Sequence, residues 1–187
     1  MIVLGINGSP RRGGNTDIAL EKALEGARSK GASVEKIVLN EIKFAPCQEC
    51  EEVKDDGTCK VMDGFQMIYQ KIREADAVIV ASPIFFGSLS AQMKMMVDRF
   101  QCHWRVKYIT KKKLWGAMRK GAFICIEASS RNDFLENAKS IAKNLFVTAN
   151  LEYTDELLVT GVDDKGKILD HPDVLKKAYE LGKKIVL

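Results

Sequence analysis

Short apolar runs alternate with longer amphipathic stretches along this chain. Continuous apolar runs at residues 2–6, 77–81 and 122–126 are typical of parallel strands that are covered on both faces. Two further stretches rich in branched residues, at 34–39 and 153–159, also have the length and composition of strands. The pattern therefore predicts five strands.

Helical periodicity is expected between these strands. Five stretches carry apolar residues on one helical stripe or begin with a helix start signal. The expected helices are residues 17–30, 63–73, 88–100, 132–149 and 172–185. Asp63 and Gln66 have the spacing of a capping pair at the start of the second helix.

The alternation of strand and helix predicts an α/β fold in a single domain over residues 1–187. We expect a doubly wound, five-stranded parallel sheet with helices on both faces and right-handed crossovers. With the strand order 2-1-3-4-5, the loops after the first, third and fourth strands meet at the carboxyl edge of the sheet. Ligands bind at this edge in such sheets.

The loop between the first strand and the first helix is rich in glycine. Residues 8–16 read GSPRRGGNT, and a turn of this kind before a helix presents backbone N–H groups to a phosphate. It lacks the G-x-G-x-x-G fingerprint, and Gly14-Asn15 stands where a P-loop has Lys-Ser/Thr. The loop therefore suits one terminal phosphate monoester, with a simple helix-capping turn as the alternative. The side chains available to a phosphate are those of Ser9, Asn15, Thr16 and either Arg11 or Arg12.

A second loop, after the third strand, places two phenylalanines at the same edge of the sheet. Pro83 stiffens this turn, and Gly87 permits a positive φ or a close backbone approach. We expect Phe85 and Phe86 to contact a flat apolar group or a partner subunit. The alternative is that both rings fill the top of the core.

These motifs together resemble the NADPH-dependent FMN reductase family, most closely its iron–sulfur flavoprotein branch. The matching residues are GSPR at 8–11, GNT at 14–16, SPIFFGSLS at 82–90, Lys94 and Asp98-Arg99. The resemblance covers nearly the whole chain. It implies a flavodoxin-like fold, a bound FMN and NAD(P)H as the reductant.

The resemblance also implies which residues hold the cofactor. The phosphate would be held by Ser9, Arg11, Gly14, Asn15 and Thr16. The isoalloxazine ring would be bordered by Pro83, Ile84, Phe85, Phe86, Gly87 and Ser88, and at its other edge by Ala128, Ser129 and Ser130. No side chain is expected to be catalytic, because a flavin supplies the hydride and electron chemistry itself.

The cysteines leave several interpretations open. Cys47 and Cys50 form a C-x-x-C pair, and Cys59 follows, so three thiols could bind an iron–sulfur cluster or zinc. The iron–sulfur branch has a further cysteine three residues after the second, where this chain has Val53. Cys102 or His103 could complete a site; otherwise the C-x-x-C is a redox disulfide or the cysteines are free thiols.

The composition and charge of the chain limit which partners and which location we expect for it. A net charge of +4 and a hydrophobic content of 46% are ordinary for a globular protein and do not call for nucleic acid. No apolar run approaches the ~20 residues that span a bilayer, and the first residues lack a signal-peptide pattern. We expect a cytoplasmic protein with no membrane partner. The aromatic and basic segment 104–115 is a candidate interface in a homodimer or homotetramer.

The predicted function is that of an FMN-dependent oxidoreductase. It would take hydride from NAD(P)H and reduce a quinone, a flavin or another small acceptor. Two alternatives stay open: an electron carrier of the iron–sulfur flavoprotein type, and a flavin-binding protein without catalysis.

Overall fold

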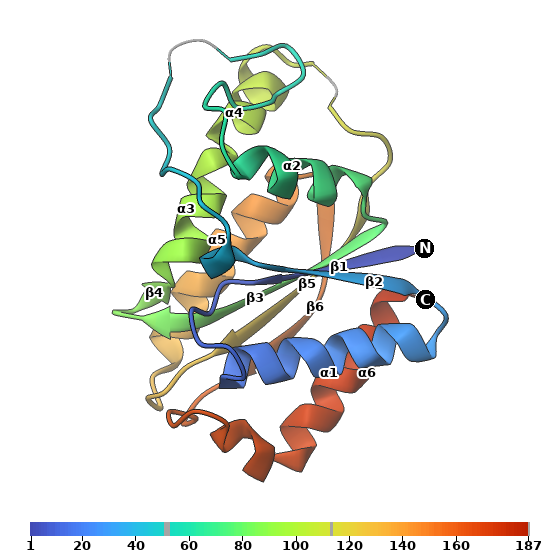
Figure 1. Cartoon of the computed structure of the whole chain (residues 1–187), viewed down its shortest axis with the longest axis vertical. Helices are drawn as coiled ribbons and strands as arrows, with labels where there is room; N and C mark the ends of the chain where they lie inside the picture. Colours follow the sequence, from blue (N-terminus) through green and yellow to red (C-terminus); the bar gives the residue numbers. More distant parts are fainter. Residues whose placement is uncertain (51–52, 113, 187) are drawn as a thin grey trace.

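In the computed structural model, which describes residues 1–50, 53–112 and 114–186, a parallel sheet separates two layers of helices (Figure 1). The main strands are β1 (Ile2–Asn7), β2 (Ser33–Val38), β3 (Ala77–Phe85), β5 (Arg119–Ile126) and β6 (Leu151–Val159). Their order is β2-β1-β3-β5-β6, with every neighbouring pair parallel. This confirms the predicted order 2-1-3-4-5, which is that of flavodoxin-like folds. Glu51, Glu52, Lys113 and Leu187 lie outside the described residues, so Lys113 of the predicted interface segment is not placed.

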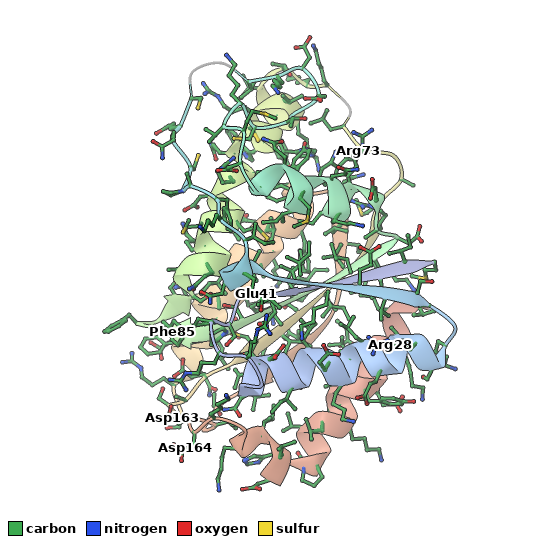
Figure 2. All side chains as sticks on the ribbon, in the orientation of Figure 1. Arg28, Glu41, Arg73, Phe85, Asp163 and Asp164 are labelled. Carbon is green, nitrogen blue, oxygen red and sulfur yellow. The ribbon has the colours of Figure 1, made fainter. Side chains whose placement is uncertain are left out.

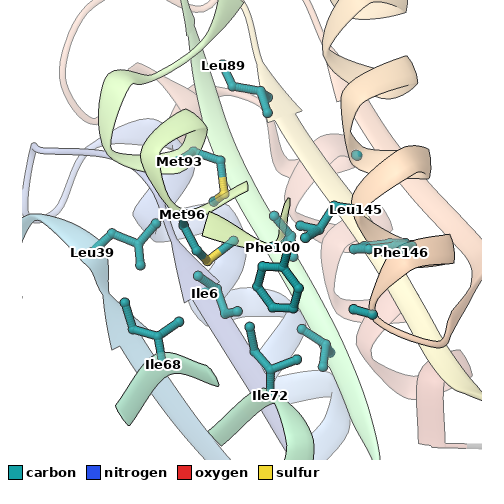
Figure 3. Packing of buried hydrophobic residues seen from close by; sticks show 14 of the residues in the cluster. Ile6, Leu39, Ile68, Ile72, Leu89, Met93, Met96, Phe100, Leu145 and Phe146 are labelled. Atoms are coloured by element: carbon teal, nitrogen blue, oxygen red, sulfur yellow. The ribbon is translucent and has the colours of Figure 1, made fainter. Parts of the chain in front are cut away.

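Each face of the sheet has its own apolar core. Helices α2 (Phe65–Glu74), α3 (Ala91–Arg99) and α5 (Asn132–Thr148) cover one face. Ile68, Met96, Phe100 and Phe146 are among the side chains buried there (Figure 3). Helices α1 (Asn15–Ser29) and α6 (Pro172–Val186) cover the other face with smaller side chains, many of them alanine. Among the described residues, no helix combines the length and apolar character that crossing a bilayer requires.

Two glycines allow α1 and α6 to pack with their backbones in contact. A Cβ atom at Gly182 would lie 1.7 Å from the Ala23 carbonyl oxygen, and one at Gly26 would lie 2.0 Å from that of Tyr179. No side chain fits at these distances. The second half of α1, the helix that follows the candidate phosphate loop, is thereby packed against a helix from the far end of the chain.

The third helix begins later than predicted. The strand β3 continues to Phe85 and turns back into β4 (Ser88–Leu89), with Phe85 paired to Ser88. Helix α3 then starts at Ala91, where the Ser90 hydroxyl accepts a hydrogen bond from the Met93 N–H at 3.2 Å. Residues 88 and 89 therefore belong to a hairpin and not to the helix.

The connection from β2 to α2 is long and holds three of the five cysteines. It begins with a short turn, η1 (Leu39–Glu41), and runs along α3 and α4 (Gln101–Trp104). The predicted capping pair is half correct. The Asp63 carboxylate accepts from the Phe65 N–H at 3.0 Å, but the Gln66 amide instead donates to two carbonyls of the connection.

Candidate functional site

The turn between β1 and α1 is folded by side chains on either side of it. The Asn7 Oδ1 accepts from the Ser9 N–H at 2.8 Å, and its Nδ2 donates to Asp17 at 2.8 Å. The other Asp17 oxygen accepts from the Gly13 N–H at 2.8 Å. Gly13 has φ of +64°, a conformation that glycine adopts without strain. Asn7 and Asp17 therefore shape the loop without being part of the predicted site.

The same turn leaves several backbone donors open. None of the hydrogen bonds among the described residues uses the N–H groups of Asn15, Thr16 or Asp17, which open α1. Gly14 stands at the N-cap position and supplies no side-chain cap. Free N–H groups and the helix dipole make this end of α1 a favourable place for an anion.

The two arginines of the loop have different roles. The Arg12 Nε donates to Glu41 at 2.6 Å on the surface. Arg11 lines the cleft beside the loop, and its guanidinium makes no ion pair within the described part of the chain. Lys165, from the segment after β6, lines the same cleft and comes near Gly13. The cleft thus has two cations, one of which sequence reasoning missed.

Asn15 uses its side chain to hold the segment after β6. Its Nδ2 lies 3.3, 3.4 and 2.9 Å from the carbonyl oxygens of residues 162–164. Its Oδ1 accepts from the Ile168 N–H at 3.1 Å. The Asn15 amide, expected to face a phosphate, instead positions Asp163 and Lys165 beside the cleft.

The other wall of the cleft is apolar. It comes from the ends of β3 and β5 and the segment after β6, and it is formed by Pro83, Ile84, Phe85, Ile126, Ala128 and Val162. In Figure 2, Phe85 and Asp163 lie at the same edge of the sheet. The cleft therefore joins a polar, cationic end to an apolar wall, at the carboxyl ends of the strands.

The structure brings most of the predicted residues together but not all of them. Those that line the cleft are Ser9, Arg11, Gly14, Asn15, Thr16, Pro83, Ile84, Phe85 and Ala128. Phe86, Gly87, Ser88, Ser129 and Ser130 do not line it. Sequence reasoning missed Ile126, Val162, Asp163 and Lys165, because nothing local to residues 162–165 indicates that Asn15 draws them to the site.

Phe86 has an unusual position at the tip of the β3–β4 hairpin. Phe86 and Gly87 have φ of +50° and +77°, as in a two-residue type I′ turn. The Phe86 side chain is fully exposed, whereas Phe85 is partly covered. The tip is held from one side by Asn137, whose Nδ2 donates to the Gly87 carbonyl at 2.8 Å. Phe86 thus projects away from the core beside the mouth of the cleft.

The acidic residue nearest the helix start is neutralised by a lysine. Burial raises the pKa of Asp17, but hydrogen bonds from Lys36 and the Gly13 N–H outweigh it and leave that pKa below its usual value. Lys36 contacts Asp17 at 2.6 Å and Glu21 at 2.6 Å. Asp17 is therefore ionised and paired, so it opposes an anion at the loop less than a free carboxylate would.

Another hollow, of about 520 Å³, lies at the opposite edge of the sheet. Its lining includes Arg73, Asp76, Trp115 and Arg119, at the amino ends of β3 and β5. Arg119 already donates to the carbonyls of Ile72, Ala75 and Ala149. This hollow lies at the C-terminal end of α2, where the helix dipole disfavours an anion, so the cleft at the start of α1 is the better site for a phosphate.

His103, named above as a residue that could complete a metal site, is buried in the core. Its Nδ1 lies 2.7 Å from the Tyr69 hydroxyl, and its ring packs 4.3 Å from that of Trp115. The Nε2 has no hydrogen-bond partner among the described residues. Burial, followed by the charges of Lys107 and Arg119, lowers the pKa of His103 to about 4. The ring is neutral at pH 7 and belongs to the core.

The predicted metal residues share one small hollow beside α3 and α4. Cys47, Cys50 and Cys59 line it together with Cys102. Within residues 1–50, 53–112 and 114–186, no three His, Cys, Asp or Glu side chains are arranged to hold a metal ion. Cys125 lies apart, buried in β5.

The sequence and the fold are similar to those of known flavoproteins and oxidoreductases. Residues 1–135 match the NADPH-dependent FMN reductase family. An iron–sulfur flavoprotein of Methanocaldococcus jannaschii is 34% identical over 192 residues, covering 99% of this chain and 95% of the relative. Two solved structures share the fold. One is a flavone reductase with a TM-score of 0.76 and 21% identity, covering 100% of this chain and 62% of that one. The other is an NAD(P)H:quinone oxidoreductase from Methanothermobacter marburgensis with a TM-score of 0.72 and 18% identity, covering 99% and 98%.

Proposed function

Since this chain belongs to the NADPH-dependent FMN reductase family, we propose that it is an oxidoreductase with FMN in the carboxyl-edge cleft. It takes hydride from NAD(P)H and reduces a quinone, a free flavin or another small acceptor. The observation that carries the proposal is the pairing of open N–H groups and two cations with an apolar wall in one cleft.

The polar end of the cleft fits a phosphate monoester. The N–H groups of Asn15 and Thr16 and the guanidinium of Arg11 would donate to its oxygens, with Lys165 as a second cation. Asp163 lines the cleft as well, and its carboxylate suits the hydroxyl groups of a ribityl chain better than a phosphate. The residues present therefore fit FMN at this end.

The apolar end fits a flat ring. Pro83, Ile84 and Phe85 offer an apolar surface that would exclude water from one side of the isoalloxazine. When bound, FMN supplies the hydride and electron chemistry, and the protein binds and orients it. No acid–base side chain is assigned to the reaction.

Anaerobic reduction tests the proposal directly. The purified protein is loaded with FMN, and its visible flavin bands are followed as NADH or NADPH is added. We expect one FMN per chain and bleaching by at least one of the two nucleotides, with reoxidation by a quinone or free flavin. A protein that takes up no FMN would contradict the site, and one that holds FMN but is bleached by neither nucleotide would contradict the reaction.

We also propose that the protein forms a homodimer or homotetramer through the helical segment after α3. Trp104, Tyr108 and Ile109 are 38%, 40% and 63% exposed, whereas Trp115 of the same predicted segment packs inside against Tyr69 and His103. Light scattering should give a dimer or tetramer mass, and Ile109→Lys should lower it. A monomeric wild-type mass would contradict the assembly.

A further inference from the structure

Four cysteines from two separate segments meet in one hollow. Cys47, Cys50 and Cys59 come from the β2–α2 connection, and Cys102 comes from α4. Cys59 and Cys102 are each only 8% exposed, whereas Cys47 and Cys50 are half-buried. The number of thiols would suffice for a metal centre, so their surroundings decide what the hollow holds.

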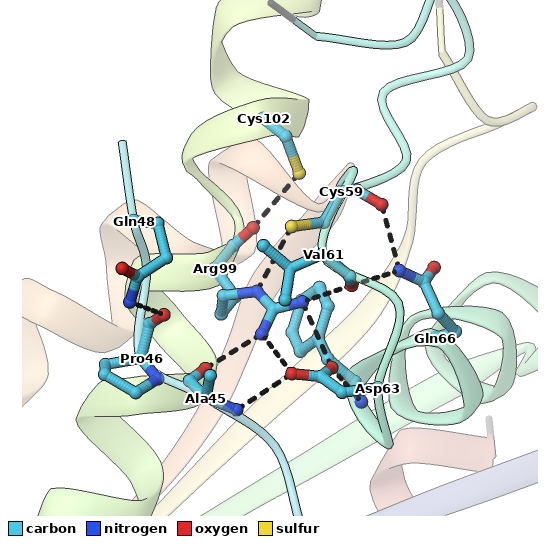
Figure 4. Close-up of polar contacts among 10 residues, drawn as sticks. Ala45, Pro46, Gln48, Cys59, Val61, Asp63, Gln66, Arg99 and Cys102 are labelled. Carbon is cyan, nitrogen blue, oxygen red and sulfur yellow. Dashed lines mark hydrogen bonds and ion pairs between the residues drawn. The ribbon is translucent and has the colours of Figure 1, made fainter. Parts of the chain in front are cut away.

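An arginine occupies the centre of this region. The Arg99 side chain is 0% exposed and comes from the last turn of α3. Its Nη1 and Nη2 donate to Asp63 at 2.9 and 3.2 Å and to the Ala45 and Val61 carbonyls at 2.8 and 2.9 Å. Its Nε donates to the Cys59 sulfur at 3.2 Å (Figure 4). We call Arg99, Ala45, Cys59, Val61 and Asp63 the Arg99 cage.

The cage satisfies the guanidinium completely. An arginine has five N–H donors, and each of them has a partner here. The Cζ atom of the guanidinium also lies 4.5 Å from the centre of the Phe65 ring. The cage therefore ties both ends of the cysteine-bearing connection to α3 without any further ligand.

The thiols are engaged by the protein itself. The Cys59 sulfur accepts from Arg99, the Cys102 thiol donates to the Arg99 carbonyl at 3.1 Å, and the Cys47 sulfur accepts weakly from the Glu49 N–H at 3.4 Å. Val53 lines the same hollow, and its side chain has no donor atom for a metal. A cubane cluster needs four thiolates pointing to one centre, and this donor set does not fit it.

We infer that this chain is a cluster-free member of a group whose relatives are named iron–sulfur flavoproteins, and that Arg99 holds the cysteine-bearing connection without a metal. All five cysteines are then free thiols. Electron transfer through a cysteine-bound relay is not supported by this hollow. The inference does not depend on FMN, because it concerns a different part of the molecule.

Metal and sulfide analysis of the full chain tests the first half of the inference. The protein is purified anaerobically, and iron, zinc, acid-labile sulfide and FMN are measured on one sample before and after incubation with ferrous iron and sulfide. We expect no stoichiometric iron, zinc or sulfide, and five titratable thiols in denaturant. About four irons and four sulfides per chain would overturn the inference, as would one zinc. FMN content is measured on the same sample. A protein without FMN would therefore contradict the proposed function, and a protein with iron and sulfide would contradict the inference drawn here.

Thiol labelling tests the second half. In the native protein the rate of alkylation of Cys59 is followed by mass spectrometry. Arg99→Met should raise this rate, whereas Arg105→Met, which removes a hydrogen bond to the Cys50 carbonyl and none to Cys59 among the described residues, should not. Where Arg99→Met does not fold, Asp63→Asn provides the same comparison with the arginine retained. Unchanged protection of Cys59 in a folded cage variant would overturn the role given to Arg99.

Discussion

The Gly8–Thr16 loop and the Arg99 cage are both polar clusters at a helix terminus, one at the start of α1 and the other at the last turn of α3, yet they use their donors in opposite ways. In the cage, every N–H of the guanidinium has a protein acceptor. At the loop, the first N–H groups of α1 and the Arg11 guanidinium have no such acceptor among the described residues. Satisfied donors stabilise the fold, whereas open donors beside a cleft indicate a ligand.

The contrast explains why similar residue types have different consequences. Arg11 is exposed, so it costs little to leave unpaired in water, and it is free to pair with an anion. Arg99 is buried, so an unpaired guanidinium there would be strongly unfavourable. Each of the following variants changes either a buried polar group of the fold or an open donor of the loop.

The largest effect is expected at the cage. Arg99→Met leaves Asp63 without its ion-pair partner and should lower the free energy of unfolding by about 3–5 kcal/mol. The affinity of the folded fraction for FMN should stay unchanged. Urea denaturation and flavin titration measure the two quantities. Arg12→Met, at an exposed ion pair, serves as the control and should leave the free energy of unfolding nearly unchanged. If the Arg99→Met protein were as stable as the wild type but bound FMN more weakly, Arg99 would belong to the cofactor site and not to the stabilising cage.

The next effect is a dependence of stability on pH that comes from His103. Its folded pKa of about 4 lies below the usual 6.5, so the unfolded chain binds the proton more readily. The contribution of His103 is complete above pH 6.5 and is lost as pH falls toward 4, by about 3 kcal/mol. His103→Gln should flatten the unfolding free energy over this window. Parallel curves for the two proteins would show that another group is responsible.

A smaller effect is expected for the open arginine. Arg11→Ala removes one charge-assisted hydrogen bond to the phosphate and should weaken FMN binding by roughly 1.5–3 kcal/mol, or about 10- to 150-fold in Kd. Unfolding should be unaffected. Arg12→Ala is the matched control, because its guanidinium already pairs with Glu41. Equal affinity in both variants would mean that the phosphate lies elsewhere.

The smallest effect is expected at Thr16. Thr16→Val keeps the shape of this buried residue and removes its hydroxyl, so FMN affinity should fall by about 0.5–1.5 kcal/mol. Riboflavin, which lacks the phosphate, should bind both proteins equally. A loss that is the same for riboflavin and FMN would place Thr16 away from the phosphate.

The sheet could be predicted because its strands are buried on both faces. Val3, Ile79 and Ile124 are fully covered, and such positions leave continuous apolar runs that need no knowledge of the partners. Boundaries were less predictable. Ser88 and Leu89 have the composition of a helix start, but pairing with β3 turns them into a strand, and pairing is a property of the folded chain.

The part of the site that lies in one continuous stretch of sequence could be predicted. The part that is brought together from distant segments by folding could not. Residues 8–16 carry the glycines and hydroxyls of an anion loop in one stretch. Lys165 reaches the same cleft through the bonds of Asn15 to residues 162–164, which are 147 or more positions away. Arg99 belongs to a motif that was recognised, but its partners Ala45, Cys59 and Asp63 lie in a connection without any periodic pattern.

The backbone conformation of Phe86 is a feature of this protein for which stability and ligand binding favour different residues. A bulky side chain in the left-handed region costs about 1–2 kcal/mol relative to ordinary backbone, and Asn-Gly is the usual solution in such a turn. An engineer who screened this chain for thermal tolerance would therefore recover Phe86→Asn early. Because strained residues cluster where proteins meet their ligands, we expect such a variant to gain stability and to lose any contact that the exposed ring makes with a ligand or a partner subunit.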